Sequence, residues 1–365
     1  FNALLLHQSY PNAWKLNRTT LIPKGGKDLR DVKNWRPITI SSMISRIFSS
    51  LLDRRLRTVI KQSARQKGFT DENGCFANTR LLSAAIATAK ENGGIFAILD
   101  VSKAFDTVSH DAIHCALERK GIPPVVANYI VGTYKGCQTT IKTKSGELAI
   151  ELKRGVKQGD PLSPLFFNLV IEPIIEAVQN ESTGVDIDGH NLAAMAFADD
   201  VILLARDRET AINQITLVCK ELQKRGMALS IDKSSVFQYI PRGRTWYVKD
   251  PELVIRDTPI PYSEPDKVFK YLGASVTPWK GLVEGFELDT FQEIIDRVKI
   301  LPIKPMQKLT LLRTYLLPRF TYGLIMRPPS RETLRNIDMV IRGGVKKILH
   351  LHETTSSAFL YTPTK

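Results

Sequence analysis

Two adjacent carboxylates, Asp199 and Asp200, are the residues of this chain that most directly suggest chemistry. They lie between an Ala- and Met-rich run and the apolar run Val201–Leu204. Such runs predict two buried strands joined by a tight turn. Because neighbouring carboxylates repel each other and lose solvation there, a divalent cation such as Mg²⁺ or Mn²⁺ is their natural partner. For an isolated pair, a simple Asp-Asp turn is the alternative.

A third carboxylate, Asp100, ends the apolar run Ile95–Leu99 and lies 99 positions before Asp199. A run of this kind predicts a strand buried on both faces, and functional side chains often lie where such strands end. Carboxylates from separate strands can hold two metal ions about 3.5–4 Å apart, which is the arrangement that catalyses phosphoryl transfer. The three carboxylates together therefore predict metal-assisted phosphoryl transfer.

The charge of the chain indicates a polyanionic partner. Its 365 residues carry a net charge of +14, from 51 Lys and Arg against 37 Asp and Glu. Nucleic acid is the first interpretation, an anionic membrane surface the second and a merely basic protein the third. No apolar run approaches the ~20 residues that cross a bilayer. We expect nucleic acid, and not a membrane, as the partner.

Two further features of the sequence concern its surroundings. Four widely spaced cysteines show no metal-ligand spacing and fit reduced thiols in a cytosolic or nuclear protein; they are Cys75, Cys115, Cys137 and Cys219. The chain opens on Phe1 rather than Met. We therefore expect it to be part of a longer protein.

The elements that must position these groups alternate between strands and helices up to about residue 285. Strands over 16–24 and 35–40 enclose a polar loop flanked by Lys24 and Arg36, which could meet a triphosphate or be solvated loop charges. A β-hairpin is predicted over 139–152, around Ser145 and Gly146. Helices are predicted over 45–60, 78–90, 110–119, 165–178 and 209–225. Beyond residue 285 a helical module is expected, with 307–317 apolar on one face.

Two smaller motifs allow alternative interpretations. The loop over 154–164 carries Gly and Gln before a helix, so it could present donors to a nucleotide or cap that helix. His110 and His114 have the spacing of a zinc-protease helix, but Asp111 replaces the general-base Glu and no third ligand follows. An ordinary helix surface is therefore expected at the two histidines.

Six blocks of the sequence, in order, resemble the reverse transcriptase motifs of non-LTR retrotransposons, most closely the site-specific R2 type. The blocks are Ile22–Lys24 with Asn34–Ile38, Leu99–Asp106, Lys157–Pro164, Phe197–Asp200, Gly226–Ser234 and Tyr271–Gly273. The resemblance implies an α+β right-hand polymerase. It places the fingers at 1–98 with part of 112–150, the palm at 99–111 and 151–283, and the thumb at 284–365.

The same resemblance implies an RNA-directed DNA polymerase that extends a DNA primer 3′-hydroxyl on an RNA template. Asp100 and Asp199 would bind two Mg²⁺ ions, for which Mn²⁺ can substitute, with the Val101 carbonyl as a further ligand. Asp200 would support them. The nucleotide-binding residues would be Lys24 and Arg36 at the triphosphate, Phe105 as the steric gate against a 2′-hydroxyl, Gln158, and Lys233 as proton donor to pyrophosphate. For Asp106 a supporting role is preferred.

The resemblance also implies how nucleic acid would be held. Tyr271, Leu272 and Gly273 would form the primer grip, and the template–primer duplex would contact Lys304, Lys308 and Arg313. The partners would be the element RNA, primer or target DNA, and dNTPs, in target-primed reverse transcription by a nuclear parent protein. R2-type proteins also carry DNA-binding and endonuclease domains, which we do not find in this chain.

Two rival functions remain at this stage. An RNA-dependent RNA polymerase uses a similar carboxylate set but is disfavoured by Phe105 and by Phe197–Ala198 before the Asp pair. A non-catalytic RNA-binding protein derived from a polymerase is disfavoured because all three carboxylates are present.

Overall fold

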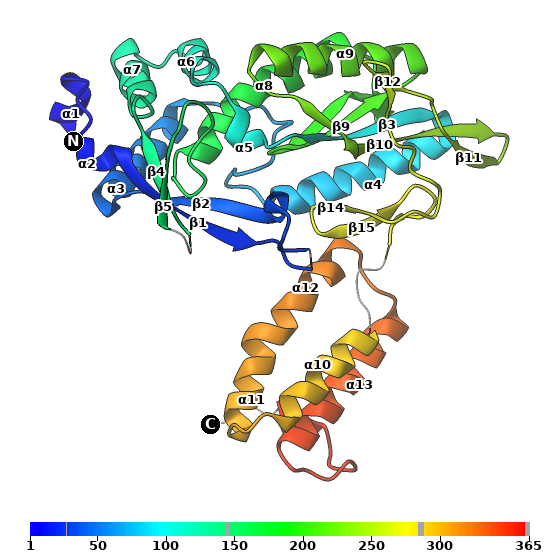
Figure 1. Ribbon diagram of the computed structural model, residues 1–365. Helices are drawn as coiled ribbons and strands as arrows, with labels where there is room; N and C mark the ends of the chain where they lie inside the picture. The colour runs from blue at the N-terminus through cyan, green and yellow to red at the C-terminus, as the bar shows by residue number, and fades with distance from the viewer. Residues whose placement is uncertain (27, 144–145, 284–287, 362–365) are drawn as a thin grey trace. The chain divides into compact units, whose positions relative to one another are not determined.

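The structure is a computed structural model that describes residues 1–26, 28–143, 146–283 and 288–361 (Figure 1). The chain divides into two compact units, Phe1–Glu264 and Pro265–Lys365, and each is described by itself. The proposed fingers, palm and thumb boundaries stay a prediction. Among the described residues, no helix combines the length and the apolar character that crossing a membrane requires.

A five-stranded antiparallel sheet organises the first unit, with strand order β11-β10-β3-β9-β8. Its central strand β3 is largely buried, as the apolar run before Asp100 predicted. The strands are β3 (Gly94–Val101), β8 (Ala194–Phe197), β9 (Asp200–Ala205), β10 (Leu229–Arg242) and β11 (Thr245–Lys249).

Helices cover both faces of this sheet, with α8 (Ser163–Glu181) and α9 (Arg208–Lys224) on one side and α4 (Gly74–Asn92) on the other (Figure 1). Alternate residues of β3 point to opposite faces. Ile95 and Leu99 join the core that α8 and α9 complete, and Phe96 stacks on Phe237 of β10 with ring centroids 5.1 Å apart. A strand buried on both faces is therefore held rigidly at its end.

The first unit also contains a separate four-stranded sheet of order β2-β1-β4-β5. It consists of β1 (Leu16–Pro23), β2 (Trp35–Ile40), β4 (Gln138–Thr143) and β5 (Gly146–Glu151), with β1 parallel to β4. The predicted hairpin is thus confirmed, although its predicted turn residue Ser145 lies outside the described residues. The other helices here are α3 (Met43–Val59), α6 (His110–Arg119) and α7 (Pro124–Gly132).

The predicted helices are confirmed, with ends that differ by a few residues. The helix predicted from residue 78 begins earlier, at Gly74, because the Asn73 side chain accepts a hydrogen bond from the Phe76 N–H (3.2 Å) and caps it. The shorter elements of the first unit are α1 (Asn2–Leu6), α2 (Asn12–Lys15), η1 (Val32–Asn34), α5 (Ala104–Thr107), β6 (Val185–Ile187), β7 (His190–Leu192), β12 (Val254–Ile255) and β13 (Thr258–Pro259).

The second unit joins a small antiparallel sheet to a group of helices. Its strands are β14 (Phe269–Tyr271), β15 (Ala274–Thr277) and β16 (Gly281–Leu282). Its helices are α10 (Leu288–Ile300), α11 (Pro305–Leu311), α12 (Leu317–Met326), α13 (Arg331–Ile348) and α14 (Ala358–Tyr361), with a π-helical turn over Leu312–Leu316. The predicted change to helical structure at Gly285 falls outside the described residues. The helical run predicted over 307–317 is present but includes the π-helical turn.

Candidate active site

The Asp199 carboxylate is presented by the turn between β8 and β9. Phe197 pairs with Asp200, so the loop consists of Ala198 and Asp199, and Asp200 is already the first residue of β9. Ala198 has φ +54°, in the left-handed region that non-glycine residues rarely adopt. The Asp pair is therefore split between a half-buried loop position and an exposed strand position.

Asp100 lies directly opposite Asp200 across the β3–β9 pair and opposite Ser230 on β10. Its side chain is 29% exposed, and its Oδ2 atom lies 3.4 Å from Lys233 Nζ. Oδ2 is buried without a hydrogen-bond partner in the structure as described. The end of β3 therefore brings Asp100 into the same place as the Asp pair, as predicted.

An irregularity in β10 brings Lys233 to Asp100. The pairing of β10 with β3 shifts between Ser230 and Ser235, so several residues of β10 have no ladder partner on β3. Within this bulge Ser234 Oγ accepts a hydrogen bond from the Asp100 N–H (3.3 Å). The predicted proton donor is thus next to a predicted metal ligand.

The three carboxylates carry negative charge that Lys233 compensates only in part. Burial raises the pKa of Asp199, and the Asp100 charge adds to this, against a backbone hydrogen bond and Lys233. Although part of Asp200 is exposed, burial of its carboxyl group, with repulsion from Asp199 and then Asp100, raises its pKa to about 6. A bound cation would reverse these shifts.

The residues present fit a divalent cation by donor type and charge. Within the described ranges, no three His, Cys, Asp or Glu residues are already gathered as a metal cage. However, Asp100 Oδ2 is buried without a hydrogen bond, and carboxylate oxygens are the ligands that Mg²⁺ and Mn²⁺ prefer. Val101 pairs with Leu229 on β10, and its carbonyl stays a predicted ligand.

A hollow of about 330 Å³ opens beside the short helix α5. Phe105 of α5 stacks on Phe167, with ring centroids 4.7 Å apart, and meets the edge of Phe69 at 6.0 Å. The hollow is lined by Phe69, Phe105, Gln158, Gly159, Asp160, Pro161, Ser163 and Pro164. Two predicted nucleotide-binding residues, Phe105 and Gln158, are thus brought together although 53 positions separate them in the sequence.

Asp106 orients the Gln158 amide. Gln158 Nε2 donates a hydrogen bond to Asp106 Oδ1 (2.9 Å), and the Gln158 carbonyl accepts one from the Thr39 N–H (2.7 Å). Burial raises the Asp106 pKa, and the Gln158 hydrogen bond, Lys103 and Lys24 act against this. The supporting role that we preferred for Asp106 agrees with these contacts.

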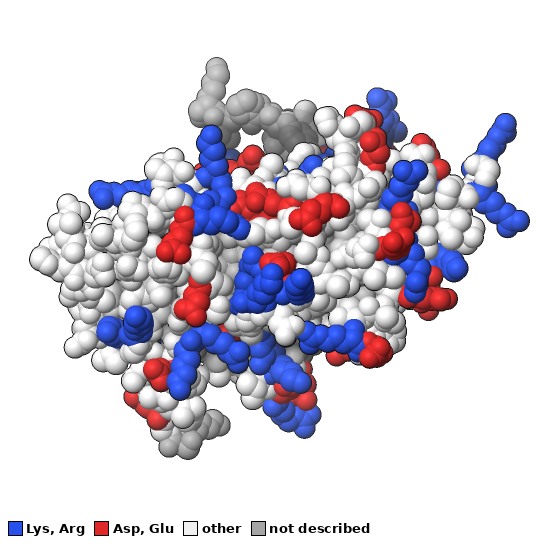
Figure 2. Space-filling model, turned by 90° about the horizontal axis from the view of Figure 1, so that it is seen from above, with Lys and Arg blue, Asp and Glu red and all other residues white. Residues whose placement is uncertain are grey.

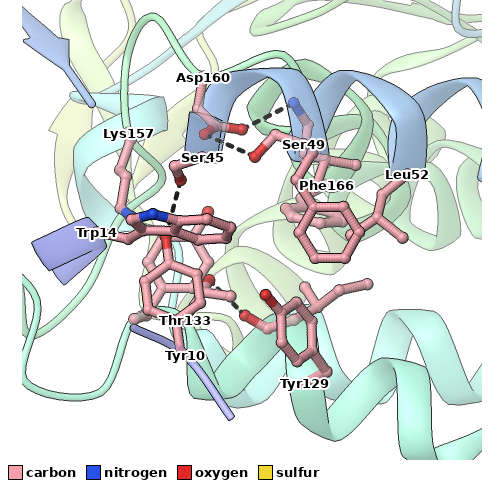
Figure 3. Close-up of a pocket in the computed structure, with 14 residues that line it drawn as sticks. Tyr10, Trp14, Ser45, Ser49, Leu52, Tyr129, Thr133, Lys157, Asp160 and Phe166 are labelled. Atoms are coloured by element: carbon pink, nitrogen blue, oxygen red, sulfur yellow. Dashed lines mark hydrogen bonds between the residues drawn. The ribbon is translucent and has the colours of Figure 1, made fainter. Parts of the chain in front are cut away.

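A second, small cavity of about 20 Å³ borders the loop that carries Gln158 (Figure 3). The buried Lys157 Nζ lies 5.3 Å from the centroid of the Tyr134 ring and 5.8 Å from that of Tyr10. Asp160 accepts hydrogen bonds from Ser49 Oγ (3.1 Å) and from a backbone N–H (3.0 Å). These contacts hold Lys157 and Asp160, which lie on either side of Gln158 in the loop. We therefore interpret this cavity as structural.

The other predicted nucleotide and duplex contacts lie on more exposed positions. Lys24 Nζ donates a hydrogen bond to the Lys33 carbonyl (2.8 Å), and Arg36 is exposed on β2 opposite Ile22. In the second unit, Lys304 precedes α11, and Lys308 Nζ donates to the Lys299 carbonyl (2.5 Å). The roles of these residues, and of the exposed Arg313, stay predictions.

The predicted primer grip forms the turn between β14 and β15. Leu272 has φ +49° and Gly273 has φ +83°. Tyr322 of α12 donates a hydrogen bond from its hydroxyl to the Leu272 carbonyl, and a Cβ at Gly273 would lie 3.1 Å from its ring. The Tyr271–Gly273 turn is therefore fixed to a helix of its own unit.

The two histidines with zinc-like spacing make other contacts. His110 Nε2 lies 3.0 Å from the Gly155 carbonyl, and its ring stacks on Tyr134 at 4.5 Å. His114 Nε2 lies 2.9 Å from Asn128 Oδ1. These contacts agree with ordinary helix positions.

Sequence reasoning missed the segment Arg65–Phe69, which contacts both the β8–β9 turn and the hollow. Gln66 hydrogen-bonds the Ala198 backbone, and Phe69 (φ +55°) lines the hollow against Phe105. The segment has no strand or helix periodicity, so its apolar pattern gave no indication of these contacts. Gly68, which lies between Gln66 and Phe69, was the available sign of a close backbone approach.

The net positive charge is not gathered on the face that carries helices α6 to α9. Figure 2 shows Lys and Arg side chains interspersed with Asp and Glu there. On the described residues of this face, side chains of the two charge signs are therefore mixed.

Comparisons with known proteins agree with this geometry. Residues 22–276 match the family "Reverse transcriptase (RNA-dependent DNA polymerase)". The chain is 36% identical to a Pol polyprotein from the retrotransposable element R2 of Popillia japonica, over 98% of this chain and 51% of the relative. It is 33% identical to the R2 counterpart of Nasonia vitripennis, over 100% of this chain and 36% of the relative. The chain thus spans about a third to a half of these relatives.

A solved structure supports the fold. Apo telomerase from Candida tropicalis superposes with a TM-score of 0.51 at 13% identity, covering 94% of this chain and 58% of that one. The resemblance to R2-type motifs and the right-hand α+β polymerase fold are therefore confirmed. This chain belongs to the reverse transcriptase (RNA-dependent DNA polymerase) family and is of the R2 retrotransposon type.

Proposed function

We propose that this chain extends the 3′-hydroxyl of a DNA primer on an RNA template by two-metal-ion nucleotidyl transfer. The observation that carries the proposal is the register of β3 and β9, which sets Asp100 opposite Asp200 with Asp199 in the adjoining turn. When bound, Mg²⁺, or Mn²⁺ in its place, supplies positive charge that activates the primer hydroxyl and stabilises the leaving pyrophosphate.

The carboxylates have different tasks in this proposal. Asp100 and Asp199 hold the ions together with the Val101 carbonyl, and Asp200 supports them from the first position of β9. Lys233, whose Nζ lies 3.4 Å from Asp100 Oδ2, gives a proton to the leaving pyrophosphate. Its 67% exposure leaves the ammonium free to exchange that proton with water.

We assign the hollow beside α5 to the incoming dNTP. Its volume of about 330 Å³ falls in the range of small-molecule sites. Phe105 presents its ring where a ribose 2′-hydroxyl would lie, and Gln158, oriented by Asp106, donates to the nucleotide. Lys24 and Arg36 bind the triphosphate as charged, flexible groups.

The parent protein would perform target-primed reverse transcription of the element RNA at a nuclear DNA target. Tyr271, Leu272 and Gly273 would hold the primer end, and Lys304, Lys308 and Arg313 would contact the duplex backbone. DNA-binding and endonuclease domains would lie in the rest of the parent. The chain's span of 51% or less of these R2 relatives leaves room for them.

Primer extension tests the proposal. A DNA primer on an RNA template is extended with Mg²⁺ and either dNTPs or rNTPs. We expect dNTP-dependent extension, and a preference for rNTPs would overturn the assignment as reverse transcriptase. Asp199→Asn keeps the size of the side chain but removes its charge, so extension should fall at least about 10³-fold.

The control is Asp188→Asn, which changes an Asp in the exposed turn between β6 and β7, where its φ is +52°. Its activity should equal that of the unchanged protein, because Asn also accepts this backbone conformation. Binding of template–primer by Asp199→Asn should stay within about twofold, since duplex affinity comes from phosphate contacts. Full extension by Asp199→Asn would remove the two-metal assignment.

A further inference from the structure

Gln66 is a buried amide that binds both polar backbone groups of Ala198. Its side chain is 1% exposed and lies in an irregular segment between α3 and α4. Oε1 accepts hydrogen bonds from the N–H groups of Ala198 (2.7 Å) and Gly68 (2.9 Å). Nε2 donates to the Ala198 carbonyl (3.2 Å).

Ala198 depends on these bonds because it is the loop residue before Asp199. The strand pairing of β8 with β9 ends at Phe197 and Asp200, so the Ala198 groups lie outside the ladder. Its φ of +54° is one that an L-residue rarely keeps without support. Ala198 is also buried, and a buried N–H or C=O without a partner is unfavourable. The direction in which Asp199 leaves the loop thus depends on the Gln66 amide.

The segment that carries Gln66 is itself fixed to β8. The Lys67 N–H donates to the Ala196 carbonyl (3.0 Å), and the Ala196 N–H donates to the Arg65 carbonyl (2.9 Å). These two bonds form a parallel bridge between Gln66 and Ala196. Helix α8 fixes the other side of the segment, because Asn168 Nδ2 donates to the Gly68 carbonyl (2.7 Å).

We infer that Gln66 is a positioning residue for catalysis: by fixing the Ala198 backbone, it holds the Asp199 carboxylate beside Asp100 for cation binding. The inference rests on the proposed role of Asp199 but concerns a different residue. Gln66 touches neither substrate nor ion in this account. It acts through the geometry of the turn.

A matched control exists at the other end of the same strand. Gln179 Oε1 accepts hydrogen bonds from the N–H groups of Ala193 (3.0 Å) and Ala194 (3.2 Å). Its Nε2 donates to the Asn191 carbonyl (2.8 Å). Gln66 and Gln179 thus each accept two backbone hydrogen bonds and donate one, next to opposite ends of β8. Only the Gln66 end carries a catalytic carboxylate.

The test compares Gln66→Leu with Gln179→Leu in two measurements. The first is hydrogen–deuterium exchange of residues 193–200 in protein freed of metal with EDTA. Gln66→Leu should speed exchange at Ala198 and Asp199 at least about 10-fold, because their restraint is lost. Gln179→Leu should affect residues 193–194 and leave Ala198 unchanged.

The second measurement is primer extension against Mg²⁺ concentration. For Gln66→Leu, kcat should fall about 10–100-fold and half-maximal activity should need about 3–10-fold more Mg²⁺, with KM for dNTP within about twofold. Gln179→Leu should lower the melting temperature but keep the Mg²⁺ dependence. Gln66→Met, which is flexible enough to fill the same space, provides the same test if the Leu variant does not fold.

The outcomes separate the two proposals. Equal Mg²⁺ dependence and equal Ala198 exchange in the Gln66 and Gln179 variants would overturn the positioning role. An unchanged protein that extends no primer would overturn the proposed function. The exchange measurement needs no activity, so it still decides whether Gln66 fixes the turn.

Discussion

The carboxylate group and the nucleotide hollow are built in different ways. Asp100 and Asp200 are set opposite each other by backbone pairing of two central strands. The hollow is formed by the short helix α5, two loops and the start of α8, and its side chains are held by stacking and by single hydrogen bonds. Metal chemistry needs fixed spacing, which a sheet provides, whereas shape selection needs aromatic surface, which loops can present.

The carboxylate group and the nucleotide hollow also differ in the groups that shift the pKa values of their Asp residues. Asp199 and Asp200 have pKa values raised by burial and by each other's charge or that of Asp100. Asp106, beside the hollow, also has a pKa raised by burial, but Gln158 and two lysines oppose the shift. In the first region Lys233 lies beside Asp100 but only partly opposes the raised pKa of Asp199, whereas in the second Asp106 has a hydrogen-bond partner within the protein.

The sharpest test of this difference replaces one Asp in each region by Asn. Asp100→Asn should lower primer extension at least about 10³-fold, because a metal-binding charge is lost. Asp106→Asn should lower it less than about 10-fold, because the amide oxygen still accepts the Gln158 hydrogen bond. Single-turnover extension at saturating dNTP measures both. Equal losses would mean that the two regions are not functionally distinct.

A smaller effect is expected when the Phe105 side chain, which lines the hollow, is shortened. Phe105→Val should lower discrimination against ribonucleotides about 10–100-fold, since the ring no longer occupies the space of a 2′-hydroxyl. Its dependence on Mg²⁺ should not change. The measurement is kcat/KM for a dNTP and its rNTP, with Phe76→Val on α4 as an exposed aromatic control. Unchanged discrimination would show that Phe105 is not the gate.

The smallest expected effect concerns stability in the carboxylate region. Because the Asp200 pKa is raised to about 6 in the folded protein, ionisation disfavours folding, and stability should fall as pH rises from about 4 to about 6. Asp200→Asn removes this dependence. Discounted for the exposure of the side chain, the variant should gain about 1 kcal/mol at pH 8 and little at pH 4. Urea unfolding in EDTA across this range measures it, and an equal gain at both values would contradict the assignment.

The strands that hold the carboxylates could be predicted from the sequence because local information was sufficient. Apolar runs ending at Asp100 and around Asp199 and Asp200 identify buried strands, and the fold family then follows from the order of the motifs. The gathering of Phe105 with Gln158 came from the resemblance. Composition alone could not predict that these two residues lie close together.

The features that the sequence did not predict depend on irregular structure and on contacts between residues far apart in the chain. Gln66 reaches Ala198 across 132 positions, and a polar residue in a loop pattern looks solvated until its partner is known. The bulge of β10 that brings Lys233 to Asp100 is a shift of register, which apolar alternation does not reveal. The π-helical turn over Leu312–Leu316 interrupts a helical run, which apolar periodicity does not reveal.

Gly68 has a consequence for how the sequence can vary. A Cβ at this position would lie 2.3 Å from the Ala198 nitrogen, and backbone cannot move aside as a flexible side chain can. Gly343 of α13, by contrast, has nothing within 4 Å of the same virtual atom. In a saturation library the two glycines should therefore behave as opposites. Position 343 should accept Ala and longer helix formers, and position 68, with no functional group of its own, should be as intolerant of replacement as the aspartates.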